Sequence, residues 1–132
     1  MSIPIPPGAA QGGPRWILRL EGVALLAAAL LAYGQVGQGW VVFALAFLVP
    51  DLSMLGYVAG RKVGAAAYNL AHSTLLPLAL GAAGWQFAEP ALTSAALIWL
   101  AHIGFDRMLG YGLKYGTAFG HTHLGQVGRA KA

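Results

Sequence analysis

The chain has 132 residues, which is enough for one domain. Hydrophobic residues make up 58% of it and charged residues only 9%, whereas a soluble domain carries about 25% charged residues. The lipid bilayer is therefore the expected surroundings. The net charge is +4, but the basic residues lie at the edges of apolar blocks, which argues against nucleic acid as a partner. The absence of cysteine excludes disulfides, thiolate metal sites and cysteine nucleophiles.

The apolar segments predict the fold class. Residues 1–14 are rich in proline and glycine, and we expect them to form a flexible N-terminal tail. Four segments of about 20 residues follow, each long enough to cross a hydrocarbon core of about 30 Å. They cover approximately residues 15–34, 39–58, 63–85 and 90–109. Short joins force antiparallel neighbours, so the sequence predicts an all-α integral membrane protein. The four transmembrane helices are expected to form an up-down bundle over residues 15–109. Residues 110–132 are expected to form a cytoplasmic or interfacial tail.

The basic residues predict the orientation. They lie at the start of the first segment, between the second and third, or at and after the end of the fourth. This bias places both termini in the cytoplasm, in a multi-pass protein of the inner (plasma) membrane. The first segment is also compatible with a signal sequence, since Arg15 and Arg19 precede its apolar run. Its length and Glu21 argue against cleavage.

Proline and glycine predict two features of helix packing. Pro50 and Pro77 are expected to kink the second and third helices. Gly56, Gly60 and Gly64 recur at four-residue spacing, which is typical of close helix contacts and also permits a homodimer.

Ionisable side chains at membrane depth are the main functional signal, because they are costly there and usually face the bundle interior. The candidates all lie in the cytoplasmic half, about 5 to 14 Å from the inner helix ends. His102 and Asp106 are four residues apart on one helical face, and Asn69 and His72 share a face of the preceding helix. We expect one site with these candidate catalytic residues: Glu21, Asp51, His72, His102 and Asp106.

A divalent metal ion suits this set, because zinc and iron both accept histidine and carboxylate ligands. The predicted ligands are His72, His102, Asp51 and Asp106. The match to carboxylate-bridged sites in helical bundles is loose, since Asn69 stands where a carboxylate is wanted. Each residue also has a structural interpretation, as a helix cap, an ion-pair partner or a hydrogen-bonded core histidine.

The C-terminal tail adds two patterns. Tyr111, Tyr115 and Phe119 recur every four residues, as on one side of a helix, which is typical of an amphipathic interfacial segment. His121 and His123 form a His-x-His pair on the same cytoplasmic side as the buried cluster. They are either further metal ligands, general acid-base groups that fold back onto the site, or surface residues.

Five motifs carry a resemblance to a known family: RLEG (19–22), PDLSMLGY (50–57), YNLAH (68–72), LIWLAHIGFDRMLGYGLKY (97–115) and HTHLG (121–125). They resemble a family of small bacterial membrane proteins known as domain of unknown function 4260, over about residues 15–129. The resemblance implies a four-span membrane protein and adds no activity. The ionisable residues singled out above all lie inside these motifs.

Four functions are open at this point. The first is a metal-dependent membrane hydrolase that activates water and acts on a lipid-soluble small molecule. The second is a small proton-coupled transporter, since a glutamate in the first helix is similar to that of small multidrug transporters; the shallow cluster and complete charge bias argue against it. The third is a haem-binding protein with His72 and His102 as axial ligands, which the nearby carboxylates disfavour. The fourth is a non-catalytic bundle whose cluster is a hydrogen-bond network.

Overall fold

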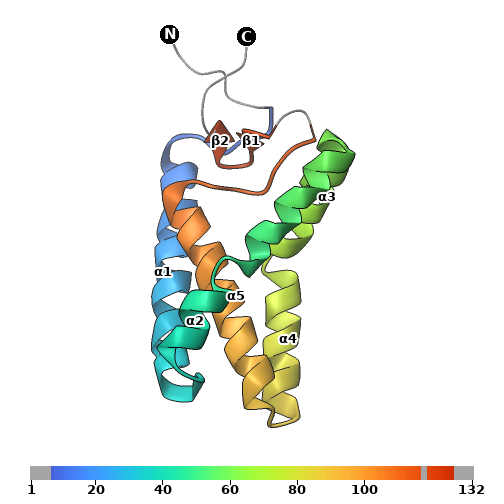
Figure 1. The fold of residues 1–132 in the computed structure, drawn as a ribbon. Helices are drawn as coiled ribbons and strands as arrows, with labels where there is room; N and C mark the ends of the chain where they lie inside the picture. The colour runs from blue at the N-terminus through green and yellow to red at the C-terminus, as the bar shows by residue number, and fades with distance from the viewer. Residues whose placement is uncertain (1–6, 117–118, 127–132) are drawn as a thin grey trace.

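The computed structural model describes residues 7–116 and 119–126, and its helices form four columns (Figure 1). The first column is α1 (Gly12–Val36). The second is α2 (Trp40–Ala46) followed by the 3-10 helix η1 (Val49–Ala59), and the third is α3 (Arg61–His72) followed by α4 (Leu75–Gln86). The fourth is α5 (Pro90–Leu109). The strands β1 (His121–Thr122) and β2 (Gly125–Gln126) form an antiparallel hairpin over the end of the molecule where α5 finishes (Figure 1).

The all-helical prediction is confirmed, and the four predicted segments fall on the four columns. The first helix begins earlier than expected, at Gly12, within the segment predicted to be a flexible tail. Residues 1–6 of that tail, and residues 117–118 and 127–132 of the C-terminal one, lie outside the described part of the chain.

Proline explains the two interruptions in the columns. A proline lacks the amide hydrogen, and its ring clashes with the carbonyl four residues earlier. Accordingly, α2 ends at Ala46, four residues before Pro50, and the third column breaks at Ser73, four residues before Pro77. Ser73 has an extended backbone, with φ −78° and ψ 145°. The expected kinks therefore occur one helical turn before each proline.

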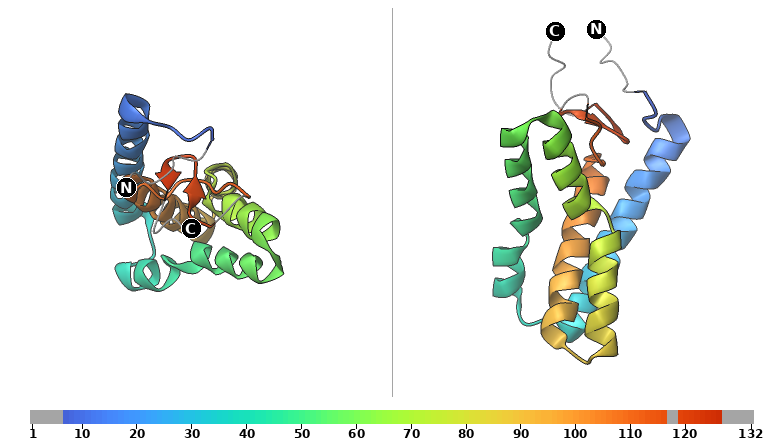
Figure 2. Two further views of the ribbon diagram at one scale, coloured as in Figure 1. Left: turned by 90° about the horizontal axis from the view of Figure 1, so that it is seen from above. Right: turned by 90° about the vertical axis from the view of Figure 1, so that its right-hand side faces the viewer.

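The centre of the fold is α5, which packs against α1 and α4, while α3 packs against η1. Figure 2 shows the other columns arranged around α5. Glycine allows α1 and α5 to cross closely, since a Cβ at Gly104 would lie 2.7 Å from the Leu26 amide nitrogen and 2.8 Å from the Gly22 carbonyl oxygen. Small residues at such crossings are typical of membrane helices.

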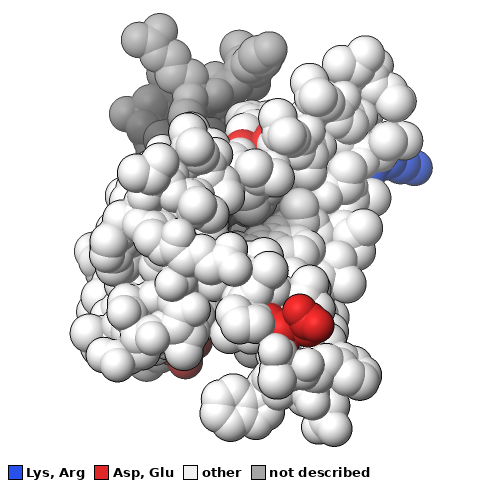
Figure 3. All heavy atoms as spheres, turned by 60° about the horizontal axis from the view of Figure 1, so that its bottom comes forward, with Lys and Arg blue, Asp and Glu red and all other residues white. Residues whose placement is uncertain are grey.

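Two helices are long and apolar enough to cross a membrane, namely Gly12–Val36 and the continuous helical stretch Trp40–Ala59. Core helices of soluble proteins meet the same criteria but are mostly buried, whereas only 17% and 6% of these two apolar windows are buried. Large apolar side chains point outwards; Val58, for example, is 91% exposed. The face in Figure 3 shows few charged side chains. Such an apolar surface indicates a membrane protein.

The C-terminal tail is not helical in its described part, so Tyr111, Tyr115 and Phe119 do not share a helix side. Gly110 ends α5 in the left-handed conformation, with φ +87°, a common helix terminus. The chain then runs extended beside the hairpin, with Lys114 bridged to Thr122. The helix interpretation failed because the frequent glycines of this segment disfavour a helix.

Candidate metal centre

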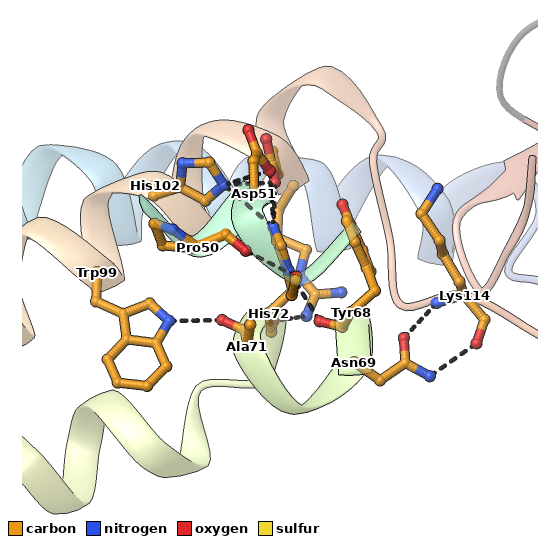
Figure 4. Close-up of polar contacts among 12 residues, drawn as sticks. Pro50, Asp51, Tyr68, Asn69, Ala71, His72, Trp99, His102 and Lys114 are labelled. Carbon is orange, nitrogen blue, oxygen red and sulfur yellow. Dashed lines mark hydrogen bonds and ion pairs between the residues drawn. The ribbon is translucent and has the colours of Figure 1, made fainter. Parts of the chain in front are cut away.

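Three elements supply the four side chains of the cluster, and the helix interruptions place two of them. Asp51 follows Pro50 in the first turn of η1, and His72 is the last residue of α3, directly before the break at Ser73. His102 and Asp106 lie one turn apart on the buried side of α5. Figure 4 shows Asp51, His72 and His102 converging. We refer to these four residues as the His/Asp cluster.

The five distances that involve a histidine Nε2 atom in the His/Asp cluster are nearly equal. The Nε2 atom of His72 lies 3.2 Å from Oδ1 of Asp51 and 3.3 Å from Oδ2 of Asp106. The Nε2 atom of His102 lies 3.2 Å from each of the same two oxygens. The two Nε2 atoms are 3.1 Å apart. All four potential ligand atoms lie within 4.8 Å of one another.

This arrangement has the size of a tetrahedral zinc site. Nε2 of His72, Nε2 of His102 and Oδ2 of Asp106 form a nearly equilateral triangle with sides of 3.1, 3.2 and 3.3 Å. Ligand atoms at the usual Zn–N and Zn–O distances of about 2.0 Å are about 3.3 Å apart in a tetrahedral site. A pure hydrogen-bond network fits less well. Each neutral imidazole Nε2 offers either one hydrogen or one lone pair, yet each faces three polar atoms within 3.3 Å. A cation at the centre satisfies all of these contacts at once.

His72 is held in the tautomer that a metal ligand requires. Its Nδ1 lies 2.8 Å from the Tyr68 carbonyl oxygen, which only accepts, so Nδ1–H donates and Nε2 keeps its lone pair. Such a hydrogen bond orients most metal-binding histidines. The Tyr68 ring also stacks on the imidazole, with centroids 3.7 Å apart and planes 8° apart. Arg107 Nη2 donates to the His72 carbonyl oxygen at 3.1 Å.

His102 is positioned by packing instead. The Phe47 ring lies against it, with centroids 5.2 Å apart. Its Nδ1 is buried and has no hydrogen-bond partner among the described residues. His102 is thus fixed by its neighbours and by the rigid, buried α5.

The four side chains differ in their exposure to solvent. His102 is 2% exposed, His72 4%, and Asp106 12%, whereas Asp51 is 30% exposed. Two carboxylates beside two histidines in such a buried place are costly unless a cation or protons balance them. Anything that reaches the His/Asp cluster from outside meets Asp51 first.

The other predicted site residues lie elsewhere. Glu21 is exposed on α1 and is outside the His/Asp cluster. The Asn69 amide pairs with the main chain of Lys114, through bonds of 2.7 and 2.6 Å. His121 lies in β1, and His123 contacts Arg107 at 3.0 Å and the Leu113 amide nitrogen at 2.8 Å. The structure therefore brings together Asp51, His72, His102 and Asp106 without these others.

The tail lies against α3, where the Lys114 main chain pairs with Asn69. Lys114 Nζ donates to the Phe119 carbonyl oxygen at 2.7 Å and lies 4.6 Å from the Tyr68 ring centroid. Burial lowers the pKa of Lys114 to about 8. Burial, and then the positive charge of Arg107, lower the pKa of His123 below its ordinary value.

Sequence reasoning missed the supporting residues Tyr68, Trp99 and Arg107. Trp99 Nε1 donates to the Ala71 carbonyl oxygen at 2.5 Å and so joins α5 to the end of α3. Tyr68 stands one turn before His72, and Arg107 stands next to Asp106. Their proximity to predicted ligands in the sequence was the only available signal.

Fold and site together define a helical protein with candidate membrane-spanning helices and a buried His₂Asp₂ cluster suited to a divalent cation. The chain belongs to the family described as Domain of unknown function (DUF4260), whose profile matches residues 15–127. The resemblance carried by its motifs is thereby confirmed. Comparisons with curated proteins and with solved structures find no match.

Proposed function

We propose that this chain is a four-span inner-membrane metalloenzyme, a hydrolase in which the His/Asp cluster holds one zinc ion and acts on a lipid-soluble substrate. The observation that carries the proposal is the set of five near-equal distances of 3.1 to 3.3 Å among the four side chains. Zinc accepts two imidazoles and one carboxylate at this spacing as its three protein ligands, and a second carboxylate lies beside them.

The positions of the cations support the proposed orientation, with both termini in the cytoplasm. Arg15 Nε donates to the Leu124 carbonyl oxygen at 2.6 Å, and Arg19 Nε donates to the Met108 carbonyl oxygen at 3.0 Å. These arginines therefore lie at the hairpin end of the molecule. The join between α1 and α2, at the opposite end, contains no lysine or arginine. Such asymmetry is typical of a cytoplasmic hairpin end.

Two of the competing functions lose support. Axial histidines of a haem lie on opposite sides of the iron with the porphyrin plane between them, which does not suit Nε2 atoms 3.1 Å apart. The transporter hypothesis depended on a glutamate within the bundle, and Glu21 is exposed on α1.

The unequal exposure of the four side chains suggests a division of labour. Catalytic zinc sites usually have three protein ligands and one position for water. We assign the three deeper residues, His72, His102 and Asp106, as ligands. Asp51, at the accessible edge, is the general base. The ion supplies electrophilic activation and lowers the pKa of water.

Asp51 then handles the proton in the reaction. Its carboxylate takes one proton from the attacking water, whose oxygen forms a bond to the acyl carbon or phosphorus of the substrate. The bond from that atom to the leaving oxygen breaks, and protonated Asp51 returns the proton to the leaving oxygen.

The metal is tested first. The protein is purified in mild detergent without chelator or histidine tag, and its metal content is measured by elemental mass spectrometry. We expect near-stoichiometric zinc in the wild type, loss of zinc in His72→Ala and His102→Ala, and retention in Glu21→Gln. Hydrolysis is then followed on amphiphilic esters and phosphoesters. Absence of any bound metal after zinc reconstitution contradicts the proposal.

A further inference from the structure

A cavity of about 340 Å³ lies beside the His/Asp cluster. Its walls come from the second column, α3 and α5, and include Ala46, Val49, Pro50, Ala71, Ile98 and Trp99. A volume of this size falls within the range of small-molecule sites, about 300 to 1,000 Å³. We call it the wall cavity.

The wall cavity is lined by chain neighbours of the cluster residues, although none of the four cluster residues lines it. Pro50 immediately precedes Asp51, Ala71 immediately precedes His72, and Ile98 stands one helical turn before His102. Figure 4 shows Pro50 and Trp99 beside the histidines. A molecule in the wall cavity thus has one end close to the potential ligand atoms.

The lining selects an apolar occupant. Besides Trp99, the only polar side chain in the wall is Ser53, and both already have partners. Ser53 Oγ donates to the Pro50 carbonyl oxygen at 2.7 Å, and Trp99 Nε1 donates to the Ala71 carbonyl oxygen. With both polar groups satisfied, the wall favours a hydrocarbon chain over a polar molecule.

The position of the wall cavity along the columns gives the direction of that chain. The second column and α5 both run towards the hairpin end (Figure 1). On both, most of the lining residues precede the cluster residue in sequence. On the second column Ala46, Val49 and Pro50 precede Asp51 and only Ser53 follows it, and on α5 all three lining residues, Ala95, Ile98 and Trp99, precede His102. The cavity therefore lies on the side of the cluster that faces away from the hairpin. Because Val49 is 54% exposed, the wall also reaches the outer surface.

We infer that the wall cavity binds the hydrocarbon chain of a cytoplasmic-leaflet amphiphile and presents the polar group at the end of that chain to the metal centre. This inference rests on the proposed function for the position of the polar group and the membrane orientation. With the hairpin end cytoplasmic, the chain points to the middle of the bilayer and the polar group to the cytoplasm. That is how a lipid of the inner leaflet already lies, so the substrate enters sideways without turning over.

Photocrosslinking tests chain binding separately from metal binding. The full-length protein is placed in phosphatidylcholine nanodiscs with a palmitic acid analogue that carries a diazirine on its chain, and crosslinked positions are mapped by mass spectrometry. We expect crosslinks in the wall cavity that unlabelled palmitic acid competes away. His102→Ala should lose zinc and keep these crosslinks, so failure of the metal site is distinguished from failure of the cavity.

Matched variants locate the site. Ala46→Phe fills the wall cavity, whereas Ala44→Phe adds the same ring to an exposed position of the same helix outside it. We expect Ala46→Phe to weaken crosslinking by about tenfold, the loss expected when two methylene groups are displaced. Zinc content should be unchanged in both variants. If Ala46→Phe does not fold, Ile98→Trp fills the same cavity. Crosslinks spread evenly over the lipid-facing surface, or unaffected by these substitutions, overturn the inference.

Discussion

Replacing Asp51 by asparagine separates a catalytic base from a fourth metal ligand. Asparagine keeps the shape of the side chain and removes its charge and basicity. Oδ1 of Asp51 lies 3.2 Å from both histidine Nε2 atoms, but the side chain is 30% exposed, against 2 to 12% for the other three. Three buried ligands are enough to hold a catalytic zinc ion, so we expect Asp51→Asn to retain zinc.

The expected effect on catalysis is large. A positioned general base contributes about 10²- to 10⁴-fold to the rate, and we expect Asp51→Asn to lower kcat by about that factor, with KM little changed. The assay is turnover of an amphiphilic ester in nanodiscs, with zinc measured on the same samples.

Glu21→Gln is the matched control, since it neutralises an exposed carboxylate outside the His/Asp cluster. It should leave zinc and turnover unchanged. If Asp51→Asn loses zinc as completely as His102→Ala, Asp51 is a fourth ligand and the tetrahedron is closed, which refutes its assignment as the base. Unchanged turnover in Asp51→Asn refutes it equally.

Three further predictions concern packing, the tail and orientation. Gly104→Ala should destabilise the fold by about 1–3 kcal/mol, measured by thermal unfolding in detergent, because the added Cβ would lie 2.7 Å from the Leu26 amide nitrogen. The lowered pKa of His123 means that the unfolded chain takes up its proton first; stability should therefore fall as the pH drops below about 6.5, which pH-dependent unfolding measures. Because the chain has no cysteine, Lys62→Cys should react with a membrane-impermeant thiol reagent only from the cytoplasmic side, and Gln38→Cys only from the opposite side.

Each of these has its own control. Gly13→Ala adds a Cβ that meets nothing within 4 Å, and it should leave the unfolding temperature nearly unchanged. His123→Gln keeps a neutral polar side chain and should remove part of the acid sensitivity; an identical pH dependence in wild type and variant contradicts the role of His123. Labelling of both cysteines from the same side contradicts the four-span topology.

The distance of each residue from the cytoplasmic end of its helix identified the cluster residues. That distance does not show which way a side chain faces. His102 and Asp106 could be assigned to one site because four-residue spacing places both on one face of a helix. Glu21 has a similar depth, yet the buried face of α1 is marked by Gly22, Ala29 and Tyr33. Successive residues of a helix are turned by about 100°, which takes Glu21 off that face.

The conformation of the C-terminal tail could not be predicted from the sequence, for a different reason. Its conformation depends on contacts with residues far away in the chain, such as the two bonds between the Asn69 amide and the Lys114 main chain. Local spacing of aromatic residues carries no information on such pairing. Asn69 was noted for sharing a face with His72; it instead holds the tail against α3.

The break before Pro77 does more than bend the third column, because it frees carbonyl groups that a continuous helix would use. In an unbroken helix the carbonyls of Ala71 and His72 would accept from amides four residues ahead. Here Trp99 donates to the Ala71 carbonyl and Arg107 donates to the His72 carbonyl. Both donors come from α5 and stand on either side of His102 and Asp106 in its sequence. The interruption thus ties the ligand-bearing end of α3 to the helix that carries the other two ligands, which sets the distances within the cluster.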